Sequence, residues 1–473
     1  MIAASNAKLA TTFAALIALS PNYRWKTGFF LAEEQNDPPT PGRQGLLVRG
    51  EGDPSMVTAD LRQIAIQLNA LGLREIPGAL YYDSSRFGAE TIPNAFGGAN
   101  NTQAWSAPIS PFILDSNALQ FFISTNNPEG TVEVLPEKPG KFLEVVSKIQ
   151  RASVTGPQVH VSQAWEADSA KYTFMGRAPE KAGSFPFGVA VEQPVDYFFY
   201  RLRDALKEQG ISGEMPLEES AGKKLNKKLL YTHISPPLRE LIVQINKESD
   251  NLAAAAVVRT SAKVAKTRPL TQKAGLSVLN GVLQNHFPGF EDQFLLRDGA
   301  GLSRETKMSA SFFVHLLNRV RNHPEFRAEY MSSLSLGGWD GTLRYRNFPA
   351  AMQGRVRAKS GTLQGVQNLS GYLQLENDVV VFSFLINAPG KKFQTLQRSQ
   401  DAVLTGVYQE FVDQEARKLA RILAEKEAKA AEEEKKMALK LKLNPPEPSY
   451  KKKPKAPLKL EPPEPSYKPT RRK

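Results

Sequence analysis

The sequence contains no cysteine, which removes disulfide bonds, zinc–thiolate sites and a catalytic thiol from consideration. Without cysteine, the sequence gives no indication of the redox state of the compartment. It also lacks any uninterrupted apolar segment of the roughly 18 residues that a membrane-spanning helix requires. Its 473 residues are instead sufficient for two or more domains with ample hydrophobic core.

Histidine and the common nucleotide-binding motifs are equally scarce. The few histidines form neither an HxxxH nor an HExxH pattern, so we interpret each as a surface or core residue and expect no metal site. No GxxxxGK[ST] or GxGxxG motif occurs, and Gly299 and Gly301 have no third glycine at the required spacing. No cofactor is therefore expected. The histidines are His160, His233, His286, His315 and His323.

Three short motifs occur in an order that indicates a serine acyl-transfer site working without histidine. An SxxK motif begins at Ser5, an SxN motif at Ser249 and a K[ST]G motif at Lys359. The same three motifs, in the same order, are found in penicillin-binding proteins and β-lactamases. The motifs are short enough to occur by chance, so their surroundings must decide whether they belong together.

Each motif has at least one further copy in the chain. SxxK recurs at Ser220, in a polar stretch with a glycine inside the motif, and at Ser449, in a proline-rich tail. SxN recurs at Ser124, at the end of an apolar strand-like run. A literal KTG begins at Lys26, directly after the first predicted helix, where no partner hairpin is evident. We interpret all four copies as coincidental.

The surroundings of the three chosen motifs suit a catalytic site. Ser5 precedes an apolar run with a four-residue spacing, which predicts a buried helix that carries Ser5 and Lys8 on one face. Ser249 follows an amphipathic stretch and precedes the helical run LAAAAVVR, so a turn between two helices is expected. Lys359 precedes two β-rich runs separated by a turn-like segment at 376–378, which predicts a hairpin with K[ST]G at a strand edge.

Ser5 is the predicted nucleophile and Lys8 its base. A serine hydroxyl is a poor nucleophile until a base takes its proton. A lysine at its usual pKa cannot act as that base. Burial and a neighbouring cation, here Lys359, disfavour the charged form and leave a neutral amine. Ser249 is expected to pass a proton between Lys8 and the leaving amine.

The remaining motif residues are expected to bind the substrate. Asn251 would hydrogen-bond a substrate amide, and Lys359 would supply positive potential near a carboxylate. The hydroxyl groups of Ser360 and Thr362 would complete the recognition of that carboxylate. Backbone N–H groups of Ser5 and Thr362 would form an oxyanion hole, commonly the largest single contribution to catalysis of this kind.

Several longer blocks resemble the class C low-molecular-mass penicillin-binding proteins, the D-Ala-D-Ala carboxypeptidase/endopeptidase family. AASNAKLATTFAALIAL resembles the nucleophile helix of that family, and RGEGDPSMVTADLRQ resembles the opening of its large insertion. LRDGAGLSR, SLSLGGWDGTLRYR and AKSGTLQGVQNLSGYL resemble three later blocks of its catalytic domain. The resemblance runs from about Ala3 to about Glu410, with every block in the family order.

The resemblance implies a multidomain α/β fold. A transpeptidase domain like that of penicillin-binding proteins and β-lactamases, with an antiparallel sheet flanked by helices, would comprise 1–27 and 228–425. A large, mostly-β insertion between the first two motifs would occupy 28–227, and a charged helix end with a basic tail would occupy 426–473. The same resemblance implies a serine D-Ala-D-Ala carboxypeptidase that acts on peptidoglycan stem peptides, is acylated by β-lactams, and works in the periplasm or facing the cell wall.

Other functions stay open at this stage. The enzyme could also be a DD-endopeptidase, or an esterase or β-lactamase-like hydrolase on the same scaffold. A non-catalytic cell-wall-binding protein is the alternative outside the enzymes. The three intact motifs favour an enzyme, whereas the oligomeric state and the balance between carboxypeptidase and endopeptidase activity are not indicated by the sequence.

The start of the chain differs from the family pattern. The family has a signal peptide and several dozen residues before the SxxK helix, whereas Ser5 here follows Met1 almost at once. We therefore expect the native protein to begin upstream of Met1, since missing sheet strands would leave unpaired edges. In a competing interpretation the first residues imitate a secretion signal, and cleavage near Pro21 would remove Ser5.

The end of the chain accounts for most of the net charge. Residues 438–473 carry eleven Lys and Arg against three Glu, a balance of +8 out of the +13 of the whole chain. They also hold a proline-rich repeat, LKLNPPEPSYK followed by LKLEPPEPSYK, which predicts an extended, disordered segment. We interpret it either as an electrostatic tether to an anionic envelope surface or as a solvated tail. No nucleic-acid-binding module accompanies the charge, so no specific nucleic acid is expected.

Overall fold

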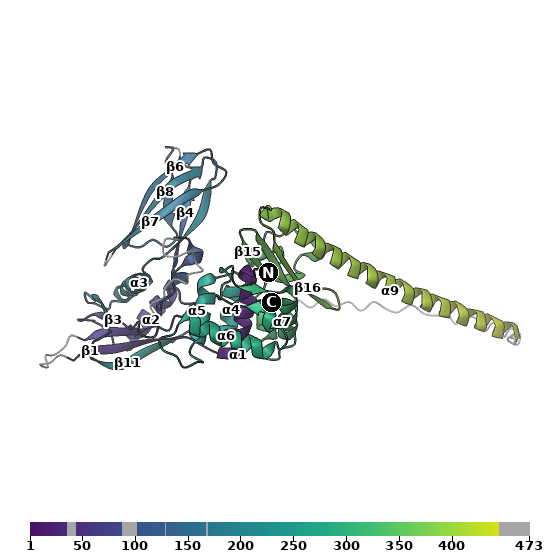
Figure 1. Cartoon of the computed structure of the whole chain (residues 1–473), viewed down its shortest axis with the longest axis horizontal. Helices are drawn as coiled ribbons and strands as arrows, with labels where there is room; N and C mark the ends of the chain where they lie inside the picture. Colours follow the sequence, from purple (N-terminus) through teal and green to yellow (C-terminus); the bar gives the residue numbers. More distant parts are fainter. Residues whose placement is uncertain (36–43, 88–101, 128, 167–168, 444–473) are drawn as a thin grey trace, which may run out of the picture. The chain divides into compact units, whose positions relative to one another are not determined.

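The computed structural model describes residues 1–35, 44–87, 102–127, 129–166 and 169–443. By its contacts the chain forms two units, Met1–Tyr408 and Gln409–Lys473. The expected end of the catalytic part at residue 425 therefore lies inside the second unit. The labelled elements of both units can be followed in Figure 1.

A group of helices encloses α1 (Ala7–Leu19), which follows a single 3-10 turn, η1 (Ala4–Asn6). Every residue of α1 from Ala7 to Leu16 is buried, because helices contact it on several sides. The buried helix expected after Ser5 is therefore confirmed. The surrounding helices are α4 (Leu238–Asn246), α5 (Asn251–Ser261), α6 (Gln272–His286), α7 (Ala310–Arg321) and α8 (Arg327–Ser332).

An antiparallel sheet in the order β14-β15-β16-β17 lies beside these helices (Figure 1). Its central strand β16 is buried along nearly its whole length, because α7 contacts it on one side and the first turns of α9 pack near it on the other. The hairpin expected after the K[ST]G motif is confirmed as β16 and β17. The strands are β14 (Ser335–Leu336), β15 (Val356–Leu363), β16 (Val366–Gln374) and β17 (Val379–Asn387), with a small separate ladder of β12 (Phe294–Leu295) and β13 (Lys307–Met308).

Between α1 and α4 the chain leaves this core and builds a second one. A five-stranded sheet in the order β10-β3-β2-β1-β11 supports α2 (Thr58–Ala70) and α3 (Pro194–Glu208), and their apolar faces form a separate hydrophobic cluster. The strands are β1 (Lys26–Glu34), β2 (Gly45–Arg49), β3 (Leu80–Tyr82), β10 (Leu217–Glu219) and β11 (Leu225–Ile234). The boundaries expected at 27/28 and 227/228 both fall within strands of this sheet.

The literal KTG at Lys26 begins a strand that has partners on both sides. Lys26 is the first residue of β1 and pairs with Ile234 of β11, about two hundred residues further along the chain. From Gly28 onward β1 also pairs with β2, the next strand in the sequence. The interpretation of this copy as coincidental stays a prediction.

The described part of the insertion also contains two three-stranded sheets. One has the order β5-β4-β9 and the other β6-β8-β7. Buried and exposed residues alternate along β4, as expected for a strand with one face on a core, and Phe121 packs against Tyr172 and Phe174 from β8. The α/β fold with a mainly β insertion is thus confirmed. The strands are β4 (Ala118–Ser124), β5 (Glu133–Pro136), β6 (Leu143–Ala152), β7 (Gln158–Glu166), β8 (Ser169–Pro179) and β9 (Ser184–Ala190).

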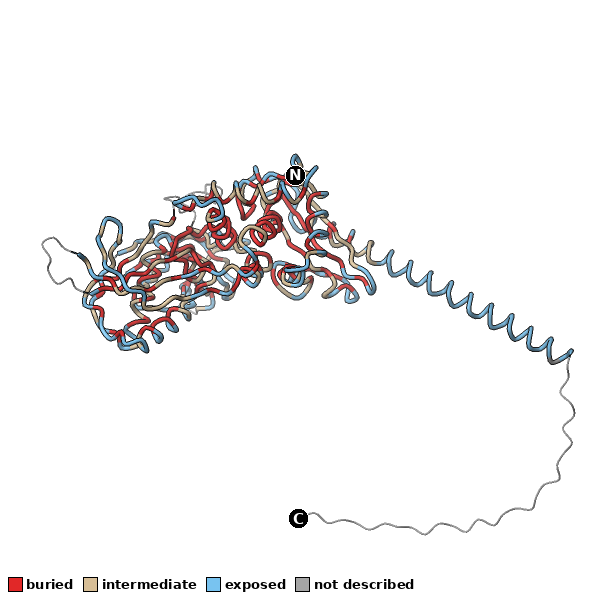
Figure 2. Tube along the Cα trace, turned by 90° about the horizontal axis from the view of Figure 1, so that it is seen from below, coloured by how far each residue is buried: buried red, intermediate tan, exposed pale blue. Residues whose placement is uncertain are grey.

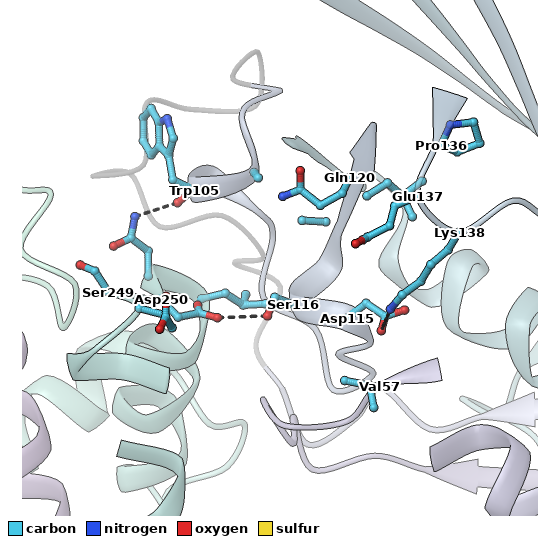
Figure 3. Close-up of a pocket in the computed structure, with 16 residues that line it drawn as sticks. Val57, Trp105, Asp115, Ser116, Gln120, Pro136, Glu137, Lys138, Ser249 and Asp250 are labelled. Carbon is cyan, nitrogen blue, oxygen red and sulfur yellow. Dashed lines mark hydrogen bonds and ion pairs between the residues drawn. The ribbon is translucent and has the colours of Figure 1, made fainter. Parts of the chain in front are cut away.

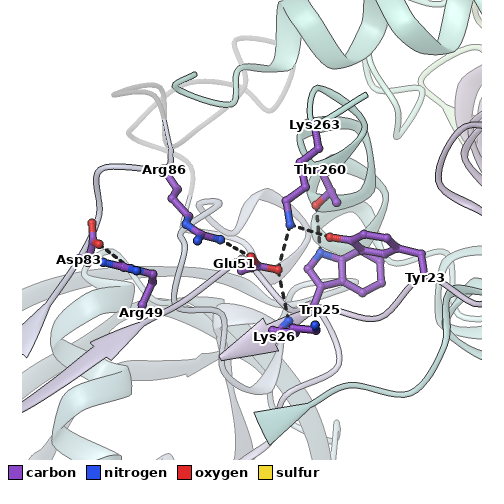
Figure 4. Close-up of polar contacts among 9 residues, drawn as sticks. All are labelled: Tyr23, Trp25, Lys26, Arg49, Glu51, Asp83, Arg86, Thr260 and Lys263. Carbon is purple, nitrogen blue, oxygen red and sulfur yellow. Dashed lines mark hydrogen bonds and ion pairs between the residues drawn. The ribbon is translucent and has the colours of Figure 1, made fainter. Parts of the chain in front are cut away.

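Polar contacts around Glu51 fasten the insertion to the helical core (Figure 4). The Glu51 carboxylate accepts a hydrogen bond from Lys263 Nζ at 2.9 Å and pairs with Arg86. Lys263 Nζ also donates to Tyr23 Oη at 2.7 Å. Burial alone would raise the pKa of Glu51, but the hydrogen bond and charge of Lys263 lower it overall, so the carboxylate stays ionised at this junction.

The last helix, α9 (Phe393–Leu443), begins in the first unit and continues through the second. Leu404 of its first part is buried with β-sheet residues such as Leu369. In the second unit the residues whose burial is described are exposed along the helix (Figure 2). The extended segment predicted from residue 438 is wrong for 438–443, which end this helix because Ala, Leu and Lys are good helix formers and no proline has yet occurred. The rest of the predicted tail, 444–473, lies outside the described residues. In the part of the chain that the structure describes, no helix combines the length and apolarity of a membrane span.

Candidate active site

Ser5 lies in the tight turn that opens α1. The residue before it, Ala4, has a φ of +46°, a left-handed conformation that costs a residue with a side chain about 1–2 kcal/mol. Two glycines allow the close packing of this turn. A Cβ atom at Gly301 would lie 1.8 Å from the Ala4 carbonyl oxygen, and one at Gly361 would lie 3.0 Å from the Ala3 oxygen. Gly301 and Gly361 therefore pack closely against the turn that carries Ser5.

Lys8 follows one turn later and is fully buried. Its Nζ atom lies 3.0 Å from Ser5 Oγ, as the i, i+3 spacing predicts. Nζ also donates to Asn251 Oδ1 and to the Ala300 carbonyl oxygen, both at 2.7 Å. The first and second motifs are thus joined directly through this amine.

Burial brings the pKa of Lys8 into the neutral range. Burial lowers the pKa of Lys8 to about 7, while the negative charges of Asp298 and Asp250 act in the opposite direction. Asp298 is itself held in place, because it accepts hydrogen bonds from Thr306 Oγ1 at 2.6 Å and from the Leu302 N–H at 2.7 Å. Lys8 can therefore exchange a proton under physiological conditions.

The second motif occupies the turn between α4 and α5, as expected. Ser249 has a φ of +63°, a second left-handed residue in the site. Asp250 caps α5 by accepting a hydrogen bond from the Ala253 N–H at 2.8 Å. Asn251 is the first residue of the helix, and its Nδ2 donates to the Trp105 carbonyl oxygen of the insertion at 3.0 Å.

The third motif lies on β15. Lys359 is fully buried, and its Nζ donates to Ser249 Oγ and to the Ser360 carbonyl oxygen, both at 2.9 Å. Burial, and then the nearby charge of Lys8, lower the pKa of Lys359 well below its usual range. Lys8 thus makes it harder for Lys359 to carry a charge, whereas the low pKa of Lys8, which was expected to depend on Lys359, is due to burial.

One edge of β15 is open along the motif. β14 pairs only with Arg357 and Ala358, so among the described residues 359–363 have β16 on one side and no strand on the other. Ser360 Oγ donates to Thr342 Oγ1 at 2.8 Å near this edge. Thr362 is exposed, and its hydroxyl donates to Gln367 Oε1 at 3.1 Å. An extended peptide can add to this edge by backbone hydrogen bonds.

The structure brings the seven predicted site residues of the three motifs together. The hydrogen bonds of Ser249 and Asn251, however, differ from those expected. Ser249 was placed between Lys8 and the leaving group, but its hydroxyl accepts from Lys359. The second-motif residue that contacts Lys8 is Asn251, whose predicted role is a hydrogen bond to a substrate amide. The oxyanion hole formed by the N–H groups of Ser5 and Thr362 stays a prediction.

The alternative copies of the motifs lie elsewhere. Ser220 and Lys223 flank the turn between β10 and β11, and Lys223 Nζ lies 3.2 Å from Glu34 and 3.0 Å from Glu218. Ser124 is the last residue of β4. Ser449 lies outside the described residues. None of the described copies shares a hydrogen bond with Ser5, Lys8 or Lys359 in the described part of the chain.

Sequence reasoning missed several contributors. The carbonyl groups of Trp105 and Ala300 bind site side chains, but a backbone carbonyl leaves no mark on residue type. Thr342, beside Ser360, lies in a block that resembles the family without belonging to a motif. Asp298, which accepts hydrogen bonds from Leu302 and Thr306, lies in the resembling block LRDGAGLSR but in none of the three motifs.

A cavity of about 500 Å³ opens beside the second motif (Figure 3). Its walls come from the helical core at 248–252 and from the insertion, including Trp105, Ser116, Gln120 and Lys138. Asp115 and Lys138 form an ion pair of 2.6 Å at its far end. Within the described residues, no group of three or more His, Asp or Glu side chains could hold a metal ion.

Comparisons with known proteins agree with this geometry. Residues 1–406 match the D-Ala-D-Ala carboxypeptidase 3 (S13) family. The chain is 25% identical over 402 residues to D-alanyl-D-alanine carboxypeptidase DacB of Haemophilus influenzae, covering 82% of this chain and 80% of the relative. It is 27% identical over 411 residues to the D-alanyl-D-alanine carboxypeptidase of Actinomadura sp., covering 82% and 73%.

The fold is similar to that of a solved structure. The crystal structure of penicillin binding protein 4 (dacB) from Haemophilus influenzae has a TM-score of 0.70 and 22% identity, covering 87% of this chain and 91% of that one. The family match spans most of the chain and includes all three motifs. The protein therefore belongs to the D-Ala-D-Ala carboxypeptidase 3 (S13) family and is a serine-type carboxypeptidase.

Proposed function

We propose that this carboxypeptidase cleaves the terminal D-Ala-D-Ala bond of peptidoglycan stem peptides through an acyl-enzyme on Ser5. The observation that carries the proposal is the contact of 3.0 Å between Ser5 Oγ and the fully buried Nζ of Lys8, whose pKa burial lowers to about 7. A base with a pKa near the working pH combines a useful neutral fraction with adequate proton affinity.

Acylation begins with proton transfer from Ser5 to Lys8. The neutral amine accepts the hydroxyl proton through its lone pair while its remaining N–H groups hold Asn251 and Ala300. Ser5 Oγ then bonds to the carbonyl carbon between the two D-alanines. The oxyanion that forms is placed against the N–H groups of Ser5 and Thr362, where preorganised donors stabilise developing charge.

Collapse of the tetrahedral intermediate breaks the peptide bond. The leaving amine takes up the proton that Lys8 accepted from Ser5, through the hydroxyl of Ser249, which Lys359 holds in place by a hydrogen bond. Lys8 is thereby neutral again. The terminal D-alanine departs as a neutral or protonated amine with its own carboxylate. Water, deprotonated by Lys8, then attacks the ester carbon, releases the shortened peptide and restores the Ser5 hydroxyl.

The open edge of β15 is the proposed binding site for the substrate. The substrate backbone would add to this edge, and the terminal carboxylate would lie near Lys359 and the hydroxyls of Ser360 and Thr362. Such a carboxylate stabilises the charged form of Lys359, which burial and Lys8 otherwise disfavour. Asn251, held by Lys8 and the Trp105 carbonyl, keeps an amide hydrogen for a substrate carbonyl.

β-Lactams are expected to acylate the same serine, since the structure with the similar fold is described as a penicillin binding protein. The cavity beside Ser249 gives room for a leaving group longer than one D-alanine, which favours endopeptidase cleavage as a second activity. The substrate places the protein in the periplasm or facing the cell wall. The basic tail would then hold it to an anionic envelope surface.

Labelling with a fluorescent penicillin tests the proposal. Wild-type protein should be labelled covalently and should release D-alanine from a stem pentapeptide, and Ser5→Ala should do neither. Ser220→Ala is the matched control and should behave as wild type. Labelling that survives in Ser5→Ala but is lost in Ser220→Ala would show that Ser220, and not Ser5, is the nucleophile. A folded wild-type protein that is neither labelled nor active would favour a wall-binding protein.

Release of product separates the remaining alternatives. An esterase or β-lactamase on this scaffold would turn over an ester or the lactam itself faster than the pentapeptide. A cross-linked dimeric stem peptide, offered in parallel, measures the endopeptidase activity directly by mass spectrometry.

A further inference from the structure

One contact between the insertion and the second motif is made by a short turn, η4 (Asp115–Asn117). Ser116 Oγ of this turn donates a hydrogen bond to Asp250 Oδ2 at 3.0 Å (Figure 3). Gln244 Nε2 of α4 donates to the same carboxylate oxygen at 2.7 Å and lies 3.2 Å from Ser116 Oγ. The residue that receives these bonds, Asp250, separates the two motif residues Ser249 and Asn251.

The backbone of this turn is unusual. Asp115, Ser116 and Asn117 have φ values of +49°, +54° and +46°, three successive left-handed residues of which none is glycine. Each such residue costs about 1–2 kcal/mol unless its surroundings hold it in place. Strained backbone that persists in a folded protein is most often found where function requires it.

Side chains on both sides of Ser116 hold the strained turn. The Asp115 carboxylate accepts hydrogen bonds from Thr58 Oγ1 at 2.5 Å and from Tyr197 Oη at 3.0 Å. Asn117 is buried, and its Nδ2 donates to the Pro108 carbonyl oxygen at 2.8 Å. Because both neighbours are tied to the body of the insertion, the position of the Ser116 hydroxyl is fixed by the insertion.

A second bond from the insertion reaches the next residue of the motif. The Trp105 carbonyl accepts from Asn251 Nδ2 at 3.0 Å, and Asn251 Oδ1 accepts from Lys8 Nζ. The turn at 249–251 thus makes two hydrogen bonds with the insertion, one at Asp250 and one at Asn251. It needs them, because Ser249 is itself left-handed and reaches Lys359 from that conformation.

We propose that Ser116 is a positioning residue for the reaction, through which the insertion fixes the turn at 249–251 in its productive conformation. Ser116 holds Asp250, and Asp250 in turn places Ser249 against Lys359 and Asn251 against Lys8. This inference rests on the proposed function of Ser5. It makes the insertion part of the catalytic apparatus and not only a separate substrate-binding or spacing module.

The position of Ser116 predicts which kinetic constant changes. Its hydroxyl bonds to Asp250 and Gln244, and both of the catalytic amines have their own partners. Loosening the turn lowers the fraction of molecules in which Ser249 can pass a proton, whereas the open edge of β15 is unaffected. The rate of acylation at saturating penicillin should therefore fall, and the half-saturating concentration should not.

Three variants of the full chain test the proposal by stopped-flow acylation with a fluorescent penicillin. Ser116→Gly removes the hydroxyl and accepts the left-handed backbone, and it should slow acylation at saturation by about tenfold, the worth of one well-placed hydrogen bond. Ser116→Asn keeps a donor and tolerates the same φ, so it should recover to within about threefold of wild type. Ser162→Gly, the same exchange at an exposed position of β7, should leave the rate unchanged.

Several results would overturn the proposal. A Ser116→Gly rate equal to wild type would do so, as would a loss that Ser116→Asn fails to rescue or that appears in the half-saturating concentration. Thermal unfolding of each variant is measured first, and Ser116→Ala replaces Ser116→Gly if the latter does not fold. If neither folds, Ser116 has a structural role and the proposal is wrong. A wild-type protein that is not labelled on Ser5 would instead overturn the proposed function itself.

Discussion

The helical half and the strand half of the active site are built on opposite principles. In the helical half, Lys8 is fully buried and bound by Ser5, Asn251 and Ala300 without any substrate. In the strand half, β15 has an open edge beyond Ala358, and Thr362 is exposed. The chemical half is therefore closed and organised in advance, while the recognition half waits for a peptide to complete it. A base that is already in position stabilises the transition state without further rearrangement. The open edge of β15 supplies binding energy that can be used in the transition state.

Removing the Lys8 amine from the helical half should have the largest effect on the rate of acylation. Lys8→Met keeps the length of the buried side chain but cannot accept the Ser5 proton. Acylation by penicillin should fall by about 10²–10⁴-fold, the usual contribution of a general base. Lys26→Met, at an exposed position of β1, is the control and should acylate at the wild-type rate. Only a modest loss for Lys8→Met would mean that another group deprotonates Ser5.

Removing the amine that links the two halves should come next. Lys359→Ala takes away both the hydrogen bond that holds the Ser249 hydroxyl in place and the positive potential for the substrate carboxylate. A loss of about 10²–10³-fold in kcat/KM is expected, in the range of other electrostatic groups aimed at developing charge. Lys26→Ala, the literal KTG copy, should have little effect. Equal sensitivity at both lysines would contradict the choice of motif.

The pH profile sharpens the description of the helical half. Acylation requires neutral Lys8, so its rate should rise with pH through a midpoint near the Lys8 pKa of about 7. The charge of Asp298 raises that pKa, and hence Asp298→Asn should lower it and move the midpoint of the acid limb to lower pH. A stopped-flow profile from about pH 5 to pH 9 measures the shift. A midpoint that stays in place or moves to higher pH would mean that the acid limb does not report the ionisation of Lys8.

The smallest effect is expected for a single hydroxyl in the strand half. Ser360→Ala removes one proposed contact to the substrate carboxylate and the hydrogen bond to Thr342. KM for a stem pentapeptide should rise by about threefold to tenfold, while kcat stays close to wild type. Steady-state D-alanine release gives both constants. If kcat falls by the same factor, Ser360 contributes to the chemical half and the comparison between the halves is too simple.

Local patterns were enough to predict the scaffold of the site. The helix after Ser5, the turn at Ser249 and the hairpin after Lys359 all follow from apolar spacing and turn residues within about twenty positions. The pairing between motifs did not follow, because which oxygen meets which amine depends on packing between segments that lie hundreds of residues apart. Ser249 meets Lys359 for this reason, and not Lys8 as expected.

Contacts made by the insertion were the hardest to foresee. Trp105 acts through its carbonyl group, which every residue type possesses. Ser116 acts from a left-handed turn in a segment without glycine, where residue type gives little sign of the conformation. The pairing of Lys26 with β11 was not evident because β11 follows only after most of the insertion. In each case the missing information concerned tertiary structure.

The burial of two amines side by side has a consequence for ligand binding. With the pKa of Lys359 well below its usual range, the site holds fewer protons than a pair of surface lysines would. A ligand carboxylate that restores the charge of Lys359 must therefore draw a proton from the solution. The heat of binding of such a ligand should then vary with the ionisation enthalpy of the buffer, which calorimetry in two buffers of equal pH would measure.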